Sequence, residues 1–127
     1  MKVEEGKLEH IRDNNIEPGK LRFDGVYFHK SPGSYYYEYI RFYEDDYSIS
    51  IAGVAEPDVI AKNFHRNKPN EHGGKYHFDS DENIRFIHKG LSNVEYVGQV
   101  GENCLYLTAF SHVTDHHSVE RFDFKPE

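Results

Sequence analysis

The 127-residue chain has no tryptophan, one cysteine and one methionine, and it contains no long apolar run. No segment approaches the roughly 20 consecutive apolar residues that a membrane-spanning helix needs, so we expect none. The single Cys104 excludes an intramolecular disulfide framework and fits a reducing compartment. It lies among apolar residues in ENCLYLTAF, and we interpret it as a buried, inert thiol.

The chain also has too few basic residues for a protein that binds nucleic acid. It carries 15 Lys and Arg against 22 Asp and Glu, which gives a formal net charge of −7. A protein that binds the phosphate backbone needs a basic face, and anionic membranes attract basic segments. We therefore expect neither nucleic acid nor a membrane surface as a partner.

Residues 1–20 are polar, and we predict that they form an arm or a short helix ahead of one domain at 21–127. A chain of this length suits a single domain with one hydrophobic core. The first fifteen residues, MKVEEGKLEHIRDNN, lack the apolar segment of a secretory signal. We therefore expect a cytoplasmic protein.

From Leu21 onward the sequence consists of short runs of β-branched and aromatic residues separated by turn signals. Such runs are typical of an antiparallel sandwich or barrel. Eight of them can be counted, at 21–29, 35–43, 47–54, 74–79, 83–88, 94–100, 104–112 and 118–124.

The connections between these runs indicate how the strands pair. Most are short, such as SPGS, EDD and GEN, so sequence neighbours are expected to form antiparallel hairpins. The one long connection, 55–73, contains Pro57-Asp58 and predicts a short helix. Eight meandering strands with one apolar face close into a barrel, which removes exposed edges. The predicted fold is an all-β, antiparallel, up-and-down eight-stranded barrel.

The tyrosine-rich run at 35–43, YYYEYIRFY, alternates between two faces. Ile40 and Phe42 share one face, and the simplest interpretation turns them inward. The opposite face would then pack beneath the 55–73 connection or the N-terminal arm. Two alternatives remain at this point: this face is a partner surface, or the register is inverted and it lines a polar lumen. The residues of this opposite face are Tyr37, Tyr39, Arg41 and Tyr43.

Two local patterns resemble known families. Gly25-Val26-Tyr27 is similar to the G-x-W motif that opens the first strand of lipocalins and related calycins, with Tyr in place of Trp. In that family an arginine on the last strand lies across the aromatic side chain, and the resemblance implies this role for Arg121.

The second resemblance is to the barrel-like domain that follows the F-box in certain F-box proteins. It is carried by the GVY sequence, by YYEYIRFY at 36–43 and by Glu56-Pro57, although this chain has no F-box. Together the two resemblances imply a lipocalin-like barrel and leave its function open.

Nine histidines raise the question of a metal site. His112, His116 and His117 lie at a predicted hairpin with Asp115 and Glu120 nearby. A zinc site needs three or four converging ligands with supporting contacts, and exposed polar turn residues account for this group without a metal. We therefore predict no metal and no cofactor.

The sequence contains no P-loop, G-x-S-x-G or H-E-x-x-H motif. Its paired aspartates, at 45–46 and at 79 and 81, lie in predicted turns, where Asp bonds to its own backbone. No catalytic residue is assigned, and an enzyme is not the expectation.

We expect a protein that binds a small hydrophobic or amphipathic molecule, because eight strands enclose packed side chains or room for one small ligand. The alternative is a protein-interaction module with a filled core that forms a homodimer or larger oligomer. The residues predicted to line the lumen are Tyr27, Tyr39, Arg41, Tyr96 and Arg121. The residues predicted for the alternative interface are Tyr35, Tyr37 and Tyr43.

Overall fold

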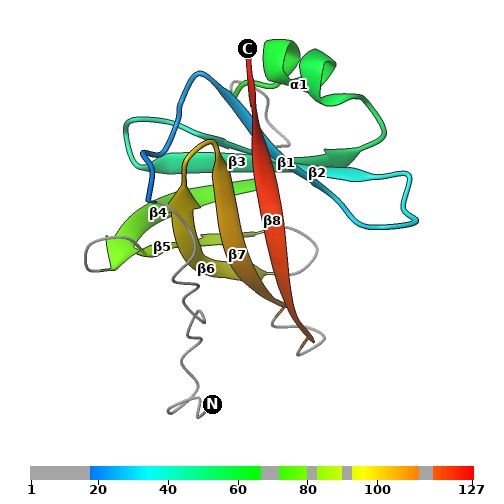
Figure 1. Cartoon of the computed structure of the whole chain (residues 1–127). Helices are drawn as coiled ribbons and strands as arrows, with labels where there is room; N and C mark the ends of the chain where they lie inside the picture. Colours follow the sequence, from blue (N-terminus) through cyan, green and yellow to red (C-terminus); the bar gives the residue numbers. More distant parts are fainter. Residues whose placement is uncertain (1–17, 67–71, 80–82, 90–92, 112–115) are drawn as a thin grey trace.

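The computed structural model describes residues 18–66, 72–79, 83–89, 93–111 and 116–127, of which 116 and 117 are described by backbone alone (Figure 1). The eight strands follow one another around a closed antiparallel barrel, β1-β2-β3-β4-β5-β6-β7-β8, which confirms the predicted fold class. The strands are β1 (Gly25–Lys30), β2 (Tyr37–Phe42), β3 (Tyr47–Gly53), β4 (His72–Asp79), β5 (Asn83–His88), β6 (Val94–Gly101), β7 (Cys104–Ser111) and β8 (His116–Pro126).

One short helix, α1 (Pro57–Asn63), lies in the long connection between β3 and β4, as the sequence predicts. Proline begins the helix, where its missing N–H costs no hydrogen bond. No helix in the described ranges is long and apolar enough to cross a membrane. Most of the predicted arm at 1–20 lies outside the described residues.

The strand register turns Ile40 and Phe42 into the barrel. Ile40 is opposite Tyr27 on β1 and Ser50 on β3, and directly paired residues share one face of a sheet. Ile40 and Phe42 are 1% and 0% exposed and belong to this inner cluster, which confirms the simplest interpretation of the alternation and rules out the inverted register. The cluster comprises Tyr27, Ile40, Phe42, Tyr76, Ile84, Phe86, Val100, Leu105, Leu107 and Phe122.

Aromatic rings fill one end of the lumen, which we call the apolar end. The Phe42 ring makes edge contacts with the rings of Tyr27, Tyr76 and Phe86 at centroid distances of 5.7, 5.2 and 5.4 Å. Leu21, which precedes β1, also packs against this cluster. The Arg22 backbone N–H donates to the Tyr27 hydroxyl at 2.9 Å, so the segment before β1 satisfies a buried polar group at this end.

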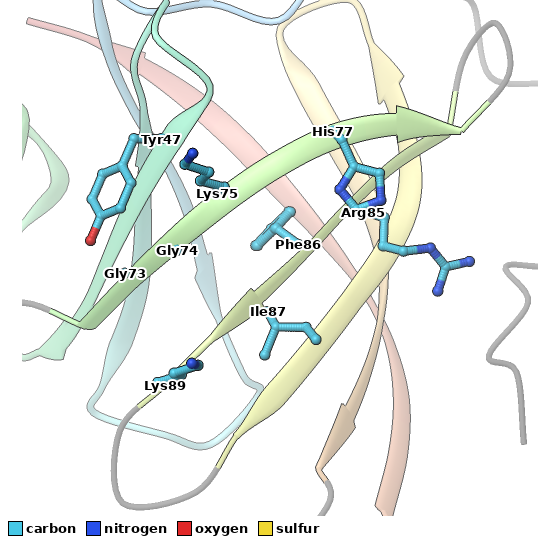
Figure 2. A pocket seen from close by; sticks show the side chains of 9 residues that line it. All are labelled: Tyr47, Gly73, Gly74, Lys75, His77, Arg85, Phe86, Ile87 and Lys89. Carbon is cyan, nitrogen blue, oxygen red and sulfur yellow. The ribbon is translucent and has the colours of Figure 1, made fainter.

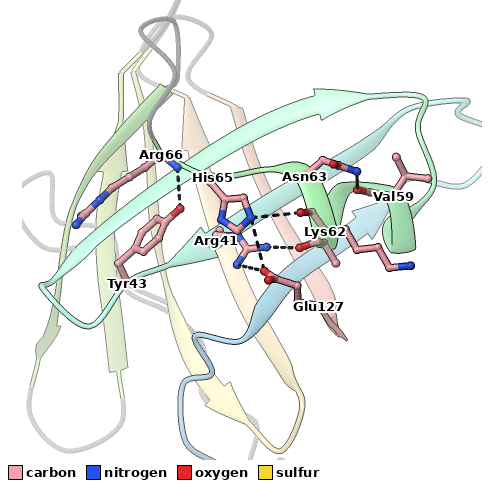
Figure 3. Close-up of polar contacts among 9 residues, drawn as sticks. Arg41, Tyr43, Val59, Lys62, Asn63, His65, Arg66 and Glu127 are labelled. Atoms are coloured by element: carbon pink, nitrogen blue, oxygen red, sulfur yellow. Dashed lines mark hydrogen bonds and ion pairs between the residues drawn. The ribbon is translucent and has the colours of Figure 1, made fainter.

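The outward side chains of β2 hold α1 against the barrel. The Tyr37 hydroxyl donates to the Glu56 carboxylate at 3.1 Å, and the Tyr39 hydroxyl donates to the carbonyl of Ala55. The Arg41 guanidinium, which is 2% exposed, donates to the carbonyl of Ala61. Figure 3 shows Arg41 between the helix and the Glu127 side chain, which it meets at 3.2 Å. The tyrosine-rich face thus packs beneath the 55–73 connection.

Gly98, in the middle of β6, permits a close approach of β7. A Cβ atom at this position would lie 1.9 Å from the Tyr106 carbonyl oxygen, so the backbone itself would have to move. We expect Gly98→Ala to lower the free energy of unfolding by about 1–3 kcal/mol, as overpacking does. The matched control is Gly53→Ala, where nothing lies within 4 Å of the added Cβ. Equal urea midpoints for the two variants would contradict this expectation.

Candidate functional site: the polar end of the barrel

The inner face of the barrel changes from apolar to polar toward the second end. The strand register pairs His29 with Glu38, Ser50 with His72, and Ala109 with Ser118. These positions continue the same alternation that places the aromatic core, so their polar side chains belong to the lumen side of the sheet. The polar end, as we use the term, consists of His29, Glu38, Ser50, His72, His88, Tyr96, Ser118 and Glu120.

His29 is oriented by the seam at which the barrel closes. The β1–β8 pairing runs from Gly25 to Phe28, and just beyond it the His29 Nδ1 atom lies 3.1 Å from the carbonyl oxygen of Arg121. A carbonyl only accepts, so the network assigns the hydrogen to Nδ1. The other nitrogen, Nε2, lies 2.8 Å from Oε2 of the Glu120 carboxylate, a distance at which two acceptor atoms need a proton or a cation between them. Nε2 also lies 3.5 Å from the Ser31 hydroxyl oxygen.

Glu38 completes a group of three side chains with His29 and Glu120. One ligand atom from each of the three lies within 4.8 Å of the other two. The Glu38 side chain is exposed to solvent, whereas those of His29 and Glu120 are 16% and 19% exposed. Ser118 donates to the second Glu120 oxygen at 2.9 Å and so holds that carboxylate in place.

The pKa of the Glu38 carboxyl reflects this crowded position. Partial desolvation raises this pKa to about 7, and the charge and hydrogen bonding of Glu120 act in the same direction. Two neighbouring carboxylates repel each other, and a cation between them relieves that repulsion.

His88 forms a separate buried network on the β3 side. Its Nε2 lies 2.7 Å from the Ser48 hydroxyl oxygen, which itself donates to the Gly74 carbonyl at 3.0 Å. Ser48 therefore accepts from Nε2–H, and Nδ1 accepts from the Ser50 hydroxyl at 2.8 Å. Burial lowers the pKa of His88 to about 4, with a smaller contribution from His72, so this histidine is neutral at physiological pH.

A cavity of about 100 Å³ opens at the polar end. Apolar groups of Ile40, Tyr96 and Phe122 contribute to its lining, as do polar groups of Glu38 and Ser50. Burial raises the pKa of the Tyr96 hydroxyl, so this hydroxyl stays protonated. The cavity adjoins the group of three, since Glu38 belongs to both and the Phe122 ring lies 5.4 Å from that of His29.

A second hollow, of about 370 Å³, lies along β4 and β5 beside Tyr47 (Figure 2). Lys75 and Lys89 line it and are exposed, so their charges are solvated. Arg85 is paired with Asp79 at 2.7 Å and Glu95 at 2.8 Å. The polar end, where titratable groups converge on a cavity, is therefore the stronger candidate site.

The five residues predicted to line the lumen do not meet in one wall. Tyr27 is buried in the apolar core, and Tyr96 lines the cavity at the polar end. Tyr39 also contributes to the lining of this cavity, but its hydroxyl donates to the Ala55 carbonyl on the outer side of the barrel. Arg41 lies outside beneath α1, and Arg121 lies outside with Asp123 at 2.8 Å. Side chains alternate along a strand, so the three outward residues have the opposite orientation to Ile40 and Phe122.

The arginine implied for the first-strand aromatic also differs from the expectation. Arg121 is on the outer face, where it donates to the Tyr106 hydroxyl at 2.7 Å. Arg22 takes the position near the buried rings instead, with its guanidinium 4.1 Å from the Phe124 ring centroid. Arg22 precedes β1 rather than lying on the last strand, so the chain does not reproduce the arrangement of the lipocalin arginine.

The three tyrosines predicted for an interface differ in their surroundings. Tyr35 is 83% exposed. Tyr37 stacks on Tyr39 at 5.7 Å, and the Tyr43 hydroxyl accepts from the Arg66 backbone N–H at 2.8 Å. Two of the three therefore make contacts within their own chain.

The histidine group at the β7–β8 hairpin lies largely beyond what the structure describes. Residues 112–115 lie outside the described residues, and residues 116 and 117 are described by backbone alone. Of that group, Glu120 is the member whose side chain is placed, and it lies with His29 and Glu38.

The sequence reasoning missed His29 and Glu38 as site residues, although a signal for them existed. His29 has the same inward parity as Tyr27, Glu38 the same as Ile40, and Glu120 the same as Phe122. An ionisable residue at an inward position of an otherwise apolar strand is costly and calls for a partner. The inward parity of these residues therefore marks them, together with inward His72 and His88, as candidates that require partners.

No family model, curated protein or solved structure matches this chain.

Proposed function

We propose that this chain is a non-enzymatic binding protein that holds one small amphipathic molecule at the polar end of its barrel. One observation carries the proposal: the lumen is packed at the apolar end yet keeps a cavity of about 100 Å³ at the polar end. Small barrels either fill their interior with side chains or hold a small ligand. In this barrel, side chains fill one end of the interior and the other end has room for a small ligand.

The lining supports a ligand with one apolar side and one polar group. Phe122 and Ile40 offer apolar surface, while Ser50, His72 and Glu38 offer groups that form hydrogen bonds. Cavities for drug-sized molecules are about 300–1,000 Å³. The smaller volume here suits a compound of few non-hydrogen atoms, or one end of a longer molecule.

The lipocalin resemblance supports the same proposal, because lipocalins are eight-stranded barrels that hold small ligands. That support rests on the fold alone, and proteins of one fold have many different functions. The specific support comes from the inward polar residues. We extend the proposal to a cytoplasmic location, since the one cysteine, Cys104, is a buried free thiol.

Native mass spectrometry of the freshly purified chain tests the proposal. We expect a reproducible mass excess that is released on denaturation. Ala52→Phe should reduce it, because Ala52 lines the cavity and a benzyl group would occupy its space. The matched control is Val54→Phe, an exposed position outside the lining. An unmodified mass for the wild-type chain, or equal retention in both variants, would contradict the proposal.

A further inference from the structure

We infer that His29, Glu38 and Glu120 bind a divalent transition-metal ion at the polar end. The three side chains come from β1, β2 and β8 and present one nitrogen and two carboxylate groups to a common point. Binding of the metal rests on these side chains alone. Its use as an anchor for a small molecule rests on the proposed function.

The spacing of the ligand atoms fits a single ion. Two atoms bound to one Zn²⁺ at about 2.1 Å lie at most about 4.2 Å apart. The three ligand atoms already lie within 4.8 Å of one another, and the distance from His29 Nε2 to Glu120 Oε2 is 2.8 Å. Glu38 is an exposed residue, so a change of its side-chain rotamer can close the remaining gap.

The surrounding contacts prepare two of the ligands. Metal-bound histidines generally donate their second ring N–H to a carbonyl or carboxylate, which fixes the tautomer and the ring orientation. His29 makes this contact with the Arg121 carbonyl at 3.1 Å. Ser118 supports Glu120 in the same way, by donating to Oε1 and leaving Oε2 directed at His29.

Charge and donor type define the class of ion. A neutral imidazole and two carboxylates carry two negative charges, which a divalent cation neutralises. The mixed nitrogen and oxygen set suits Zn²⁺, Mn²⁺, Fe²⁺ or Co²⁺ better than Ca²⁺, which takes six to eight oxygen ligands. Three protein ligands leave at least one coordination position for another donor.

A molecule in the adjoining cavity can occupy the open coordination position of the metal ion. Glu38 lines the cavity and belongs to the metal ligands, so a molecule in the cavity lies next to the ion. A small carboxylate, alcohol or amine could coordinate the ion while its apolar part contacts Phe122. This arrangement specifies the polar group expected of the proposed ligand, namely a metal-binding donor.

The inference is tested by titrating the chelator-treated full chain with Zn²⁺ in an isothermal calorimeter and by measuring its thermal unfolding with and without Zn²⁺. We expect one equivalent to bind and the thermal midpoint to rise. Glu38→Gln and Glu120→Gln should each weaken binding by more than about tenfold, since each removes a charged ligand. Co²⁺ supplies a second readout, because its visible absorption depends on the geometry and donor atoms around the bound ion and should change in His29→Gln.

The control variant is His77→Gln, which removes an exposed histidine that lies 3.6 Å from Asp79. Unchanged affinity in this control, with loss in the three variants above, supports the site. Absence of Zn²⁺ binding by the wild-type chain overturns the inference, as does equal affinity in all the variants. If the metal does not bind but the chelator-treated protein still retains a small molecule, the inference alone fails. If the metal binds and no small molecule is found, the proposed function alone fails.

Discussion

Phe42→Ala is expected to lower the free energy of unfolding by about 3–5 kcal/mol, the usual cost of removing a buried phenylalanine ring. Phe42 is fully buried, and its ring contacts three other aromatic rings. These neighbours belong to β1, β4 and β5, so the closed sheet around them cannot easily collapse into the space left behind. A loss of this size is a large fraction of the roughly 5–15 kcal/mol that stabilises a typical domain.

Urea unfolding followed by far-ultraviolet circular dichroism measures this effect, because the chain has no tryptophan to serve as a probe. The matched control is Phe78→Ala, which makes the same substitution at a side chain that is 49% exposed. We expect a loss of about 1 kcal/mol or less there, because exposed substitutions leave no buried cavity. Equal losses of unfolding free energy in the two variants would show that the Phe42 ring and its aromatic neighbours do not form the centre of the core.

Lowering the pH from 7 to 4 is expected to remove about 3 kcal/mol of stability that neutral His88 provides. The unfolded histidine takes up a proton near its usual pKa of about 6.5, whereas the folded one does so only near its pKa of about 4. Between these values the unfolded state binds more protons, so stability falls as the pH falls. At about 1.4 kcal/mol for each pKa unit the full window corresponds to about 3.5 kcal/mol, of which about 3 kcal/mol is lost by pH 4, where the folded histidine is half protonated.

The structural cause of this loss is the pair of hydroxyls that bind neutral His88. Ser48 accepts from Nε2–H, and Ser50 donates to Nδ1, so protonation of Nδ1 requires the Ser50 hydroxyl to reverse its direction. His72 on β4 adds a repulsive charge once it is protonated. On the remaining side, the Tyr96 ring lies 5.9 Å away and supplies no compensating charge, since its hydroxyl stays protonated.

His88→Gln isolates this effect, because glutamine offers a donor and an acceptor but does not titrate. We expect the difference in unfolding free energy between wild type and variant to shrink as the pH falls from 7 to 4. The raised pKa of Glu38 makes stability fall as the pH rises. Because Glu38 is present in both proteins, its contribution cancels in the difference between wild type and variant. A difference that stays constant with pH would refute the prediction. The measurements are made with a chelator present.

Much of the fold follows from local patterns in the sequence. Period-2 alternation in YYEYIRFY places Ile40 and Phe42 on one face whatever the rest of the chain does, because a strand turns successive side chains to opposite sides. Short connections require neighbouring strands to pair as hairpins, and Pro57 marks the start of the helix. The closed meander with one helix in the 55–73 connection is therefore predictable from the sequence.

The candidate site depends on contacts that are distant in sequence. Glu120 lies about ninety residues from His29, and only the β1–β8 seam that closes the barrel brings them within 2.8 Å. Local alternation assigns Glu38 to the inner face but does not identify the side chains that face it from other strands. The role of Arg41 has the same origin, because its partners are the Ala61 carbonyl on α1 and Glu127 at the other end of the domain.

The sequence alone specifies which residues form strands, which face of each strand is apolar, and that neighbouring strands pair as hairpins, because these properties depend on residues a few positions apart. Tertiary structure decided which end of the lumen is filled and which keeps a cavity. It also decided that the outward tyrosines of β2 hold a helix, and that one imidazole and two carboxylates converge. The physical reason is closure: the β1–β8 seam joins the first strand to the last, and no local pattern encodes what then meets across it.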